Sequence, residues 1–563
     1  MPELDNLQHR THLLGGLPIV NRFLERLHLE EILRDRLPTP SGSRLGPAPC
    51  LGVLLRNLLL SREPLYGLAS WAAPYRSDLL GLRPWGATLL NDDRLGRALD
   101  TLFDADRASL ATEIVVRAIR EFHLAMDCFH NDSTTITLQG AYASAMGARK
   151  RGRTTLRAAF GHNKDHRPDL KQLLWILTIS ADGAVPVAYR TEDGNRNDSP
   201  THRESWDTLR GLTGRTDFFY VADSKLCSDN NLRYIDGQGG RFLTVLPRSR
   251  KEDRLFRDYV QTHELPWEEV LRRPNPRDQY GPMDVWRMAE SPIPAGDGFR
   301  LAWVWSSLMA DRDRESREGR MAKAILSLEK LETRLRSPKT KLRTRETVAR
   351  AAEKAVGPTA RRWVRWEITE ENVEKFRQEH RGRPGKETRY RKTERIRYHV
   401  VWQPEGEAIL YDARSDGMFP LLSNDRKLSL GELLTRYHFQ PRLEKRHEQL
   451  KTVYEVAPVW LKKVERIEAL LFVYFLTLLV EALIEREVRQ GMEREERESL
   501  PLYPEGRPCP APTTDKVLEA FDRVEAHELV REGRTLRRFG PELTEPQRDL
   551  LRLAGVPEES YGQ

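Results

Sequence analysis

A chain of 563 residues is long enough for two or three domains, each with its own hydrophobic core. Hydrophobic residues make up 39% of the chain and charged residues 31%, as in a soluble globular protein, and the longest apolar run (469–480) is shorter than the roughly 20 residues of a membrane span. The formal charge of +8 and the pI of about 9.2 favour a nucleic-acid partner without establishing one, and four widely spaced cysteines exclude a CxxC zinc site or a disulfide framework.

Residues 1–122 are predicted to form a helical N-terminal domain. Apolar residues between 19 and 27 recur every three or four positions, which indicates an amphipathic helix. Pro64 separates an apolar segment at 51–60 from a second one at 65–71, a pattern compatible with a helix-turn-helix. Two helices around a turn are also common in ordinary packing, so DNA binding and simple packing both remain open for this region.

Residues 123–250 are strand-rich and are predicted to form the first part of an α/β catalytic core. The expected elements are a strand ending near Asp132, a hairpin at 173–190, a helix at 202–212, a strand at 218–221 just before Asp223, an amphipathic helix at 230–235 and a strand at 241–247. This order is that of the ribonuclease-H-like fold, in which the first and fourth strands lie side by side. Asp132 and Asp223 are therefore expected to meet.

Carboxylates on neighbouring strand ends suit a two-metal phosphoryl-transfer site. Mg²⁺ prefers hard oxygen ligands, and two such ions can bracket the attacking and leaving oxygens. Because the chain contains 84 Asp and Glu, a set of three carboxylates can be selected by coincidence, and residue type alone does not identify a site. The prediction therefore depends on the strand-end placement and on a third carboxylate.

The segment from Tyr437 to Lys451 supplies that third carboxylate. Its spacing is Tyr–x6–Glu–x6–Lys, with Glu444 in the middle. Seven residues are about two helical turns, so the three side chains would share one face if one helix ran through them. Pro441 fits only in a first turn, which predicts a helix start near Gln440.

The long stretch between Asp223 and Glu444 predicts an inserted domain at 251–425. Its ends are expected to be strands, at 299–307 and 397–403, and its middle helical and basic, because residues 311–365 contain 17 Lys/Arg against 8 Asp/Glu. Arginines alternate with aromatic rings in one short segment, which suits phosphate contact with base stacking. That segment contains Arg362, Trp363, Arg365 and Trp366. The alternative is that both tryptophans pack in the core of the insertion.

The remaining chain is divided into two parts. Residues 426–491 are predicted to close the catalytic core with the Glu444 helix, and the apolar run 469–480 is expected to be a buried helix. Residues 492–563 are interpreted as a Pro-rich linker and a small helical tail, with a capping-box-like pair at Thr544 and Gln547.

The segment around Glu444 resembles a motif of the DDE transposases of bacterial insertion sequences, in the group with a Tyr–x2–Arg–x3–Glu–x6–Lys box. Tyr437, Glu444 and Lys451 match this box, whereas Gln440 occupies the arginine position and Arg442 lies two residues nearer the glutamate. Further stretches resemble the same group: LGGLPIVNRFLERL, LNDDRLGRALD, GHNKDHRPDLKQ and DGMFPLLSND. These stretches extend over nearly the whole chain, and it is their order that makes the resemblance specific.

This resemblance implies a ribonuclease-H-like catalytic core with a large insertion before the last catalytic helix, plus the helical N-terminal domain. Asp132, Asp223 and Glu444 would be the catalytic residues and would ligate two Mg²⁺, for which Mn²⁺ can substitute. Lys451 would pair with a phosphate. The further candidates for DNA contact are Tyr437, Arg442, Lys164, Arg167 and Lys171.

The function implied is that of a DNA transposase that binds the inverted repeats of an insertion sequence and catalyses strand cleavage and transfer. A homodimer would hold the element ends and the target DNA. The first twelve residues lack the apolar core of a signal peptide, so we expect a cytoplasmic, nucleoid-associated bacterial protein without a membrane partner. Two alternatives remain: a ribonuclease-H-like nuclease that does not join strands, and an inactive, domesticated DNA-binding protein.

Overall fold

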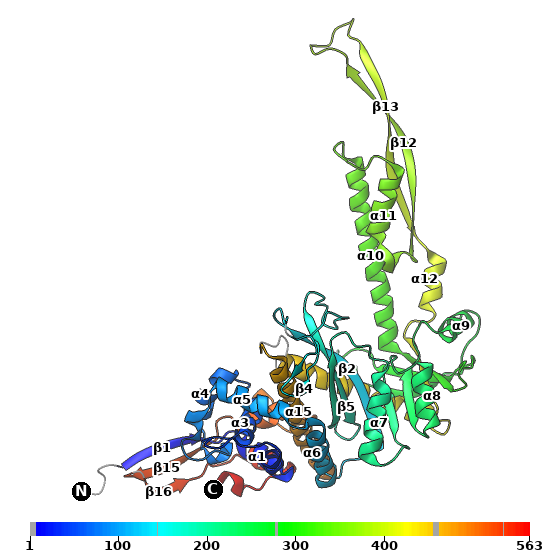
Figure 1. The fold of residues 1–563 in the computed structure, drawn as a ribbon. Coiled ribbons are helices and arrows are strands. Elements are labelled where there is room, and N and C mark those ends of the chain that lie inside the picture. Colours follow the sequence, from blue (N-terminus) through cyan, green and yellow to red (C-terminus); the bar gives the residue numbers. More distant parts are fainter. Residues whose placement is uncertain are drawn as a thin grey trace. The chain divides into compact units, whose positions relative to one another are not determined.

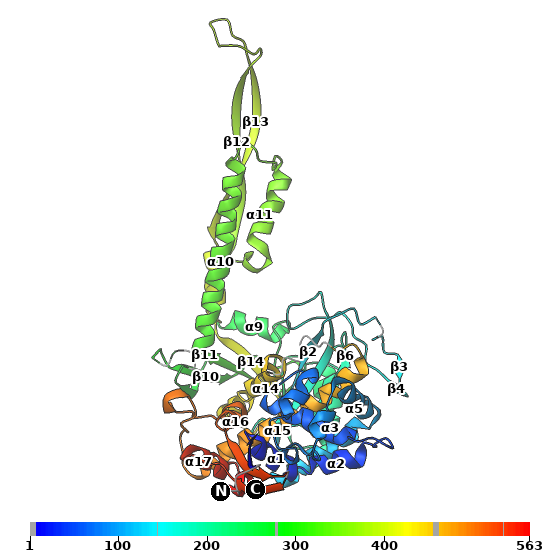
Figure 2. The same ribbon diagram turned by 90° about the vertical axis from the view of Figure 1, so that its left-hand side faces the viewer.

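The computed structural model describes residues 7–143, 145–275, 278, 280–453, 461–532 and 534–562. The chain divides into two compact units, whose elements are labelled in Figure 1 and seen from a second direction in Figure 2. Unit 1 consists of Met1–Thr244 and Thr435–Gln563, and unit 2 of Val245–Leu434. In sequence, unit 2 is therefore an insertion between the two segments that build unit 1.

The N-terminal part of unit 1 is helical apart from one strand, β1 (Leu7–Leu13). Its helices and 3₁₀ turns are α1 (Leu17–Arg26), α2 (Leu29–Arg36), α3 (Pro47–Leu60), η1 (Leu65–Gly67), α4 (Leu68–Ala72), η2 (Asp78–Leu80), η3 (Gly86–Leu89), α5 (Asp92–Asp104) and α6 (Arg107–Glu121). α1 buries Ile19, Val20, Phe23 and Leu24, the apolar face that its periodicity predicted. α3 and α4 flank Pro64 at the two segments where helices were expected.

Five strands of unit 1 form a mixed sheet, so the chain is a mixed α/β protein as its sequence predicts. They are β2 (Cys128–Leu138), β5 (Lys171–Ser180), β6 (Pro186–Asp193), β7 (Phe219–Ala222) and β8 (Arg241–Val245), in the order β6-β5-β2-β7-β8. β5 is antiparallel to β2 and β6, whereas β2, β7 and β8 are parallel. α7 (Thr201–Thr213) connects β6 to β7 and α8 (Asp229–Gly237) connects β7 to β8, while β3 (Arg149–Lys150) and β4 (Arg153–Thr154) form a short hairpin. The first and fourth predicted strands, β2 and β7, are neighbours.

α15 (Val464–Arg494) is the central helix of unit 1. It packs against α3, α5 and β6, and the ring of Phe475 stacks on Tyr189 with the ring centroids 4.6 Å apart. Among the described residues it is the one helix long and apolar enough to cross a bilayer, and 94% of its most apolar window is buried inside the protein. The apolar run 469–480 is thus a buried core helix, as expected.

The C-terminal tail adds strands that the sequence analysis missed. β15 (Glu525–Arg531) and β16 (Arg534–Phe539) form an antiparallel sheet with β1, in the order β1-β15-β16. The other elements are η5 (Pro504–Gly506), α16 (Thr514–Glu519), α17 (Glu545–Leu553) and α18 (Glu559–Gly562). Thr544 and Gln547 form the predicted capping box of α17. In the Pro-rich segment, Leu500 and Cys509 are buried and form an isolated antiparallel β-bridge through their backbones.

Unit 2 is built on four antiparallel strands. They are β9 (Glu268–Arg273), β10 (Asp284–Glu290), β11 (Arg300–Ser306) and β14 (Met418–Ser423), in the order β14-β11-β10-β9. α9 (Lys251–Tyr259) packs its Phe256 ring on Trp303 of β11, with the ring centroids 3.4 Å apart. α12 (Gly406–Ala413) leads into β14.

Between β11 and α12, residues 307–404 form an elongated arm of unit 2, which can be followed in both ribbon views (Figure 1; Figure 2). It consists of α10 (Ser307–Arg336), α11 (Arg345–Ala360) and the hairpin of β12 (Val364–Gln378) and β13 (Tyr390–Pro404), called the ribbon below. Leu328 of α10, Val348 of α11 and Val400 of β13 belong to one buried cluster. The helices were predicted, but β12 was not.

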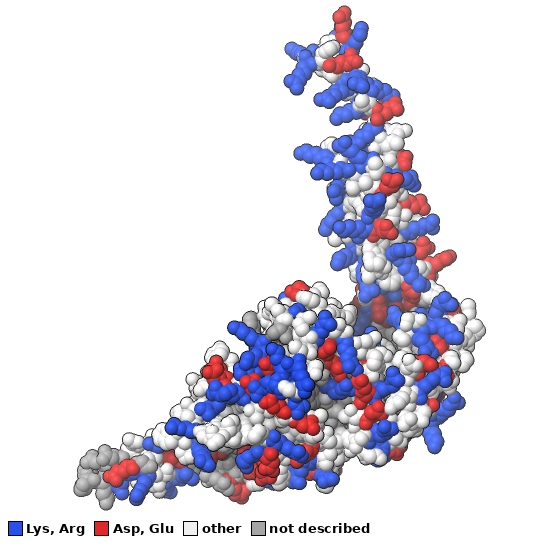
Figure 3. Space-filling view, viewed as in Figure 1, with Lys and Arg blue, Asp and Glu red and all other residues white. Residues whose placement is uncertain are grey.

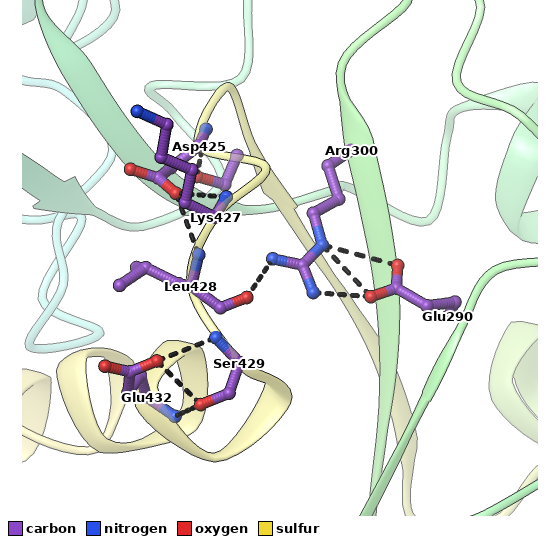
Figure 4. A network of polar contacts seen from close by, with 8 residues as sticks. Glu290, Arg300, Asp425, Lys427, Leu428, Ser429 and Glu432 are labelled. Atoms are coloured by element: carbon purple, nitrogen blue, oxygen red, sulfur yellow. Dashed lines mark hydrogen bonds and ion pairs between the residues drawn. The ribbon is translucent and has the colours of Figure 1, made fainter.

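The segment after β14 is fixed by polar contacts (Figure 4). Arg300 binds Glu290 on β10 and donates to the carbonyl of Leu428 at 2.5 Å. Ser429 and Glu432 form a reciprocal capping pair: the Ser429 amide donates to the Glu432 carboxylate at 2.7 Å, and the Glu432 amide donates to Ser429 Oγ at 3.2 Å. This pair starts α13 (Leu430–Tyr437), whose last residue is the tyrosine of the predicted box.

Candidate active site

Asp132 and Asp223 occupy adjacent positions on neighbouring parallel strands. The last residues that pair β2 with β7 are Asn131 and Ala222, so each aspartate is the next residue along the chain. Asp223 follows the end of β7, as predicted. Asp132 does not end its strand, because β2 continues to pair with β5 as far as Leu138. The predicted strand end at Asp132 is therefore wrong, although the two carboxylates are brought together.

Burial and mutual repulsion disfavour the charged forms of these carboxyl groups. Burial raises the pKa of Asp223, and the negative charge of Asp132 raises it further. Burial also raises the pKa of Asp132, although the ammonium of Lys164 acts in the opposite direction. The ionised forms of these carboxyl groups are therefore disfavoured unless a cation binds beside them.

Glu444 joins this cluster from α14 (Gln440–Glu448), which packs against β2 and β5. α14 begins at Gln440, where Pro441 predicted its first turn. The Gln440 side chain is buried, contacts His130 Nδ1 of β2 at 2.9 Å and donates to the Asn131 carbonyl at 3.4 Å. The pKa of Glu444 is raised by burial and then by the charge of Asp132. Asp132 therefore lies within electrostatic range of both Asp223 and Glu444.

Lys164 is the cation beside the cluster. Its Nζ lies 3.5 Å from Asp132 Oδ1 and donates hydrogen bonds to the Ser133 carbonyl and, at 3.2 Å, to Ser133 Oγ. Lys164 was predicted to contact DNA or to close over the site. In the structure it partly neutralises Asp132.

Asp198 is a fourth carboxylate, which the sequence analysis missed. Ser133 Oγ donates to Asp198 Oδ2 at 2.9 Å, and the charge of Asp198 contributes to the raised pKa of both Asp132 and Asp223. It lies in the polar loop between β6 and α7. In the sequence, Asp198 is marked only by its position in the loop that follows the hairpin predicted at 173–190.

His447 is a second missed residue. It lies one helical turn after Glu444, so both side chains share a face of α14. His447 is buried, and its Nε2 lies 3.8 Å from Asp132 Oδ2. Burial, followed by the charges of Lys164 and Lys451, lowers the pKa of His447 to about 3. The imidazole is therefore neutral at physiological pH.

The Tyr–Glu–Lys box does not lie on one helix. Tyr437 ends α13, Glu444 lies on α14, and Lys451 belongs to a π-helical turn, η4 (Gln449–Val453). Burial, and then the charges of Glu444 and Asp223, raise the pKa of Tyr437 to about 12, which places its phenol beside the carboxylates. Lys451 Nζ pairs with Asp165 at 2.5 Å. The tyrosine reaches the cluster across a helix break, because Pro441 starts a new helix.

The other predicted contacts of unit 1 have local partners. Arg167 pairs with Asp169 at 2.7 Å, and Lys171 Nζ donates to the Ala141 carbonyl at 2.7 Å. Arg442 is exposed and lines a shallow cavity together with Asp182 and Arg486. Gln440, rather than Arg442, makes the contact with β2 described above.

In unit 2 the predicted residues divide into two environments. Arg362 and Trp363 line a cavity of about 510 Å³, where the Trp363 indole donates to Asp412 at 2.6 Å and Arg362 pairs with the same carboxylate at 3.2 Å. Trp366 is half-buried against the helical core of the arm. Arg365 is exposed and lies 3.7 Å from Glu367. The core alternative thus describes the surroundings of Trp366 better than those of Trp363.

The donor chemistry of the carboxylate cluster fits a hard divalent cation. Its oxygens repel one another, and a lysine ammonium already lies among them. Within the described ranges, no three His, Cys, Asp or Glu side chains stand close enough together to hold one ion as they are placed. The four carboxylates therefore form an electrostatic cluster rather than a ready coordination shell.

Comparison with known proteins matches one segment of the chain to a family. Residues 9–116 match a family described as a domain of unknown function, DUF4277. No curated protein matches the chain. A solved structure of a piggyBac transposase synaptic complex with hairpin DNA is similar over 90% of this chain and 78% of that chain, at 8% sequence identity and a TM-score of 0.34. At this level of similarity, fold and function have to be argued from the chain's own residues.

Proposed function

We propose that the protein is a DNA transposase of the DDE type, with a ribonuclease-H-like core in unit 1. The observation that carries the proposal is the parallel register of β2 and β7, which sets Asp132 beside Asp223, with Glu444 in range on α14. The strand order β6-β5-β2-β7-β8 supports it, because the first and fourth strands of the predicted fold are neighbours.

Asp132, Asp223 and Glu444 are the proposed ligands of two Mg²⁺ or Mn²⁺ ions. Such ions would activate the attacking oxygen and stabilise the leaving oxyanion of a phosphodiester. The chain itself contributes a set of oxygen donors whose pKa values are raised first by burial and then by the charges of neighbouring carboxylates. Bound cations would relieve that repulsion, which is the driving force for assembling the site.

The surrounding residues have supporting roles. Gln440 anchors α14 to β2, and the hydrogen bond from Ser133 to Asp198 ties the β6–α7 loop to the same strand. His447 fills the space behind Asp132 as a neutral imidazole. Tyr437 keeps its phenolic proton and can donate a hydrogen bond to a phosphate oxygen. Lys451 would exchange Asp165 for a phosphate when DNA is bound.

A cleavage and joining assay tests the proposal. Purified protein, a labelled duplex ending in the element's inverted repeat, and Mg²⁺ should yield strand cleavage followed by joining to a target duplex. Asp132→Asn and Glu444→Gln should each lower the cleavage rate by roughly 10³-fold or more while sparing DNA binding. The matched control is Asp217→Asn, because Asp217 is an exposed carboxylate that pairs with Arg215. This variant should behave like wild type.

Each other outcome has a definite meaning. Cleavage without joining would identify a nuclease. DNA binding without cleavage by the wild-type protein would identify an inactive DNA-binding protein. Full activity of Asp132→Asn would reject the assignment of the carboxylates.

A further inference from the structure

The two faces of the ribbon carry different charges. Residues directly opposite each other on antiparallel strands share a face, and successive residues alternate between faces. The register pairs Lys375 with Thr393, Arg377 with Arg391, and Val373 with Arg395, so these six residues lie on one face. The four cations in this outer part of the face, Lys375, Arg377, Arg391 and Arg395, are called the basic stripe.

The basic stripe is exposed and not neutralised. All four side chains are exposed, and none of them forms an ion pair with another residue that the structure describes. Arg377 and Arg391 are direct cross-strand partners. Like charges in that position destabilise a hairpin, so the pair breaks a local rule, and neither arginine forms an ion pair with a described carboxylate.

The opposite face shows how a merely solvated ribbon would be arranged. It carries Glu374 and Glu394, and its one cation in this region, Lys392, pairs with them at 2.6 and 2.9 Å. In this outer part of the ribbon, acid and base are therefore matched on one face, whereas the other face carries the four cations. Closer to the start of β12, that second face also holds Glu371, which pairs with Arg397 at 3.3 Å. Figure 3 shows Lys and Arg side chains gathered along the β12–β13 end of the arm, in the upper part of the view.

We propose that the basic stripe binds the phosphates of duplex DNA, with the ribbon lying along the major groove. Two strands about 4.8 Å apart form a ribbon that fits a groove about 12 Å wide. Duplex RNA fits less well, because its major groove is deep and narrow. The inference extends the proposed function, since it names the part of unit 2 that would hold DNA, and it moves the contact away from the helical stretch 311–365.

The test measures binding without catalysis. Full-length protein and a fluorescent duplex of arbitrary sequence are titrated in EDTA at several salt concentrations. Arg377→Ala/Arg391→Ala should reduce the slope of log affinity against log salt by about 2 and weaken binding roughly 10–100-fold at 0.1 M salt. Its melting temperature should be unchanged or higher, because the opposed arginines no longer repel each other.

Two further variants make the result specific. Lys375→Ala/Arg395→Ala leaves the opposed pair intact and should give a similar change in slope. Lys392→Met removes a cation from the other face of the same ribbon and should bind like wild type. Duplex RNA should compete more weakly than duplex DNA.

An unchanged slope for both stripe variants would overturn the inference. So would an equal loss for Lys392→Met, which would indicate a general charge effect, or equal competition by RNA, which would indicate unspecific polyanion binding. The two proposals fail separately. If wild type does not cleave in Mg²⁺ but the stripe variants lose binding, only the catalytic assignment falls. If wild type cleaves and the stripe variants bind normally, only this inference falls.

Discussion

The two units hold clusters of like charge in opposite ways. In unit 1, Asp132 and Asp223 are half-buried and Glu444 is more exposed, and partial loss of hydration is the first cause of the raised pKa of each. In unit 2, the side chains of the basic stripe are exposed to solvent, where dissolved ions screen their charges. The comparison teaches that burial decides which solution variable controls a cluster. Protons and divalent cations should control the carboxylates, whereas ionic strength should control the stripe.

The largest contrast is expected between a buried and an exposed ion pair. Arg446 and Glu485, both about 4% exposed and 2.9 Å apart, join α14 to α15. Glu485→Ala leaves Arg446 buried without its carboxylate and should destabilise the protein by about 3–5 kcal/mol. Glu367→Ala removes an exposed partner of Arg365 on the ribbon and should change stability by at most about 1 kcal/mol. Chemical denaturation of both variants provides the comparison, and similar losses would contradict it.

A smaller effect is expected from Asp132→Asn in the metal-free protein. The pKa of Asp132 is higher in the folded state than in the unfolded chain, so the stability associated with this group is fully present below pH ~3.9 and is lost as pH rises through the folded pKa. The variant should therefore match wild type near pH 4 and be more stable at pH 7, by roughly 1 kcal/mol. Melting curves in EDTA across this range check the sign. A variant less stable than wild type at pH 7 would show that the carboxylate is well compensated.

Lys164→Ala should sharpen the role of divalent cations. The Lys164 ammonium, 3.5 Å from Asp132, competes electrostatically with any cation at the cluster. Removing it should strengthen Mg²⁺ binding about fivefold, since two charges at this distance interact by about 1 kcal/mol in water. The measurement is the Mg²⁺ concentration that gives half of the maximal thermal stabilisation. Lys171→Ala, whose ammonium binds a backbone carbonyl instead, is the control.

The smallest effect concerns the stripe itself. Arg377→Ala should raise the stability of the ribbon by a few tenths of a kcal/mol at low salt, because it removes the repulsion from Arg391. The gain should vanish in 1 M salt, where the screening length is about 3 Å. Hydrogen exchange of the ribbon amides at the two salt concentrations measures it. A gain that persists at high salt would need a cause other than charge.

The sequence was most informative where local patterns and long-range pairing agree. The hairpin β5–β6, the strand before Asp223 and the start of α14 at Gln440 followed from alternation, turn residues and Pro441. The end of β2 was misplaced because it depends on β5, which keeps pairing beyond the point where β7 stops. No local pattern reports the length of a partner strand.

Other misses have the same origin. β1 pairs with β15, which lies more than 500 residues further along the chain, and nothing in either segment names its partner. β12 loses its apolar alternation after Ile368, since charged residues occupy both faces of the outer ribbon. Asp198 and His447 became candidates only when the fold placed them next to Asp132.

The register of β2 and β7 has a consequence for how this chain can change over generations. Side chains alternate between the faces of a sheet, so inserting or deleting one residue before Asp132 within β2, or before Asp223 within β7, would turn that carboxylate to the other face. The loop between β6 and α7 and the whole of unit 2 lie outside those two strands and are free of this restriction. Changes in length should therefore be absent from these two short segments and common in the β6–α7 loop and in unit 2, and a library of single-residue insertions would display this pattern directly.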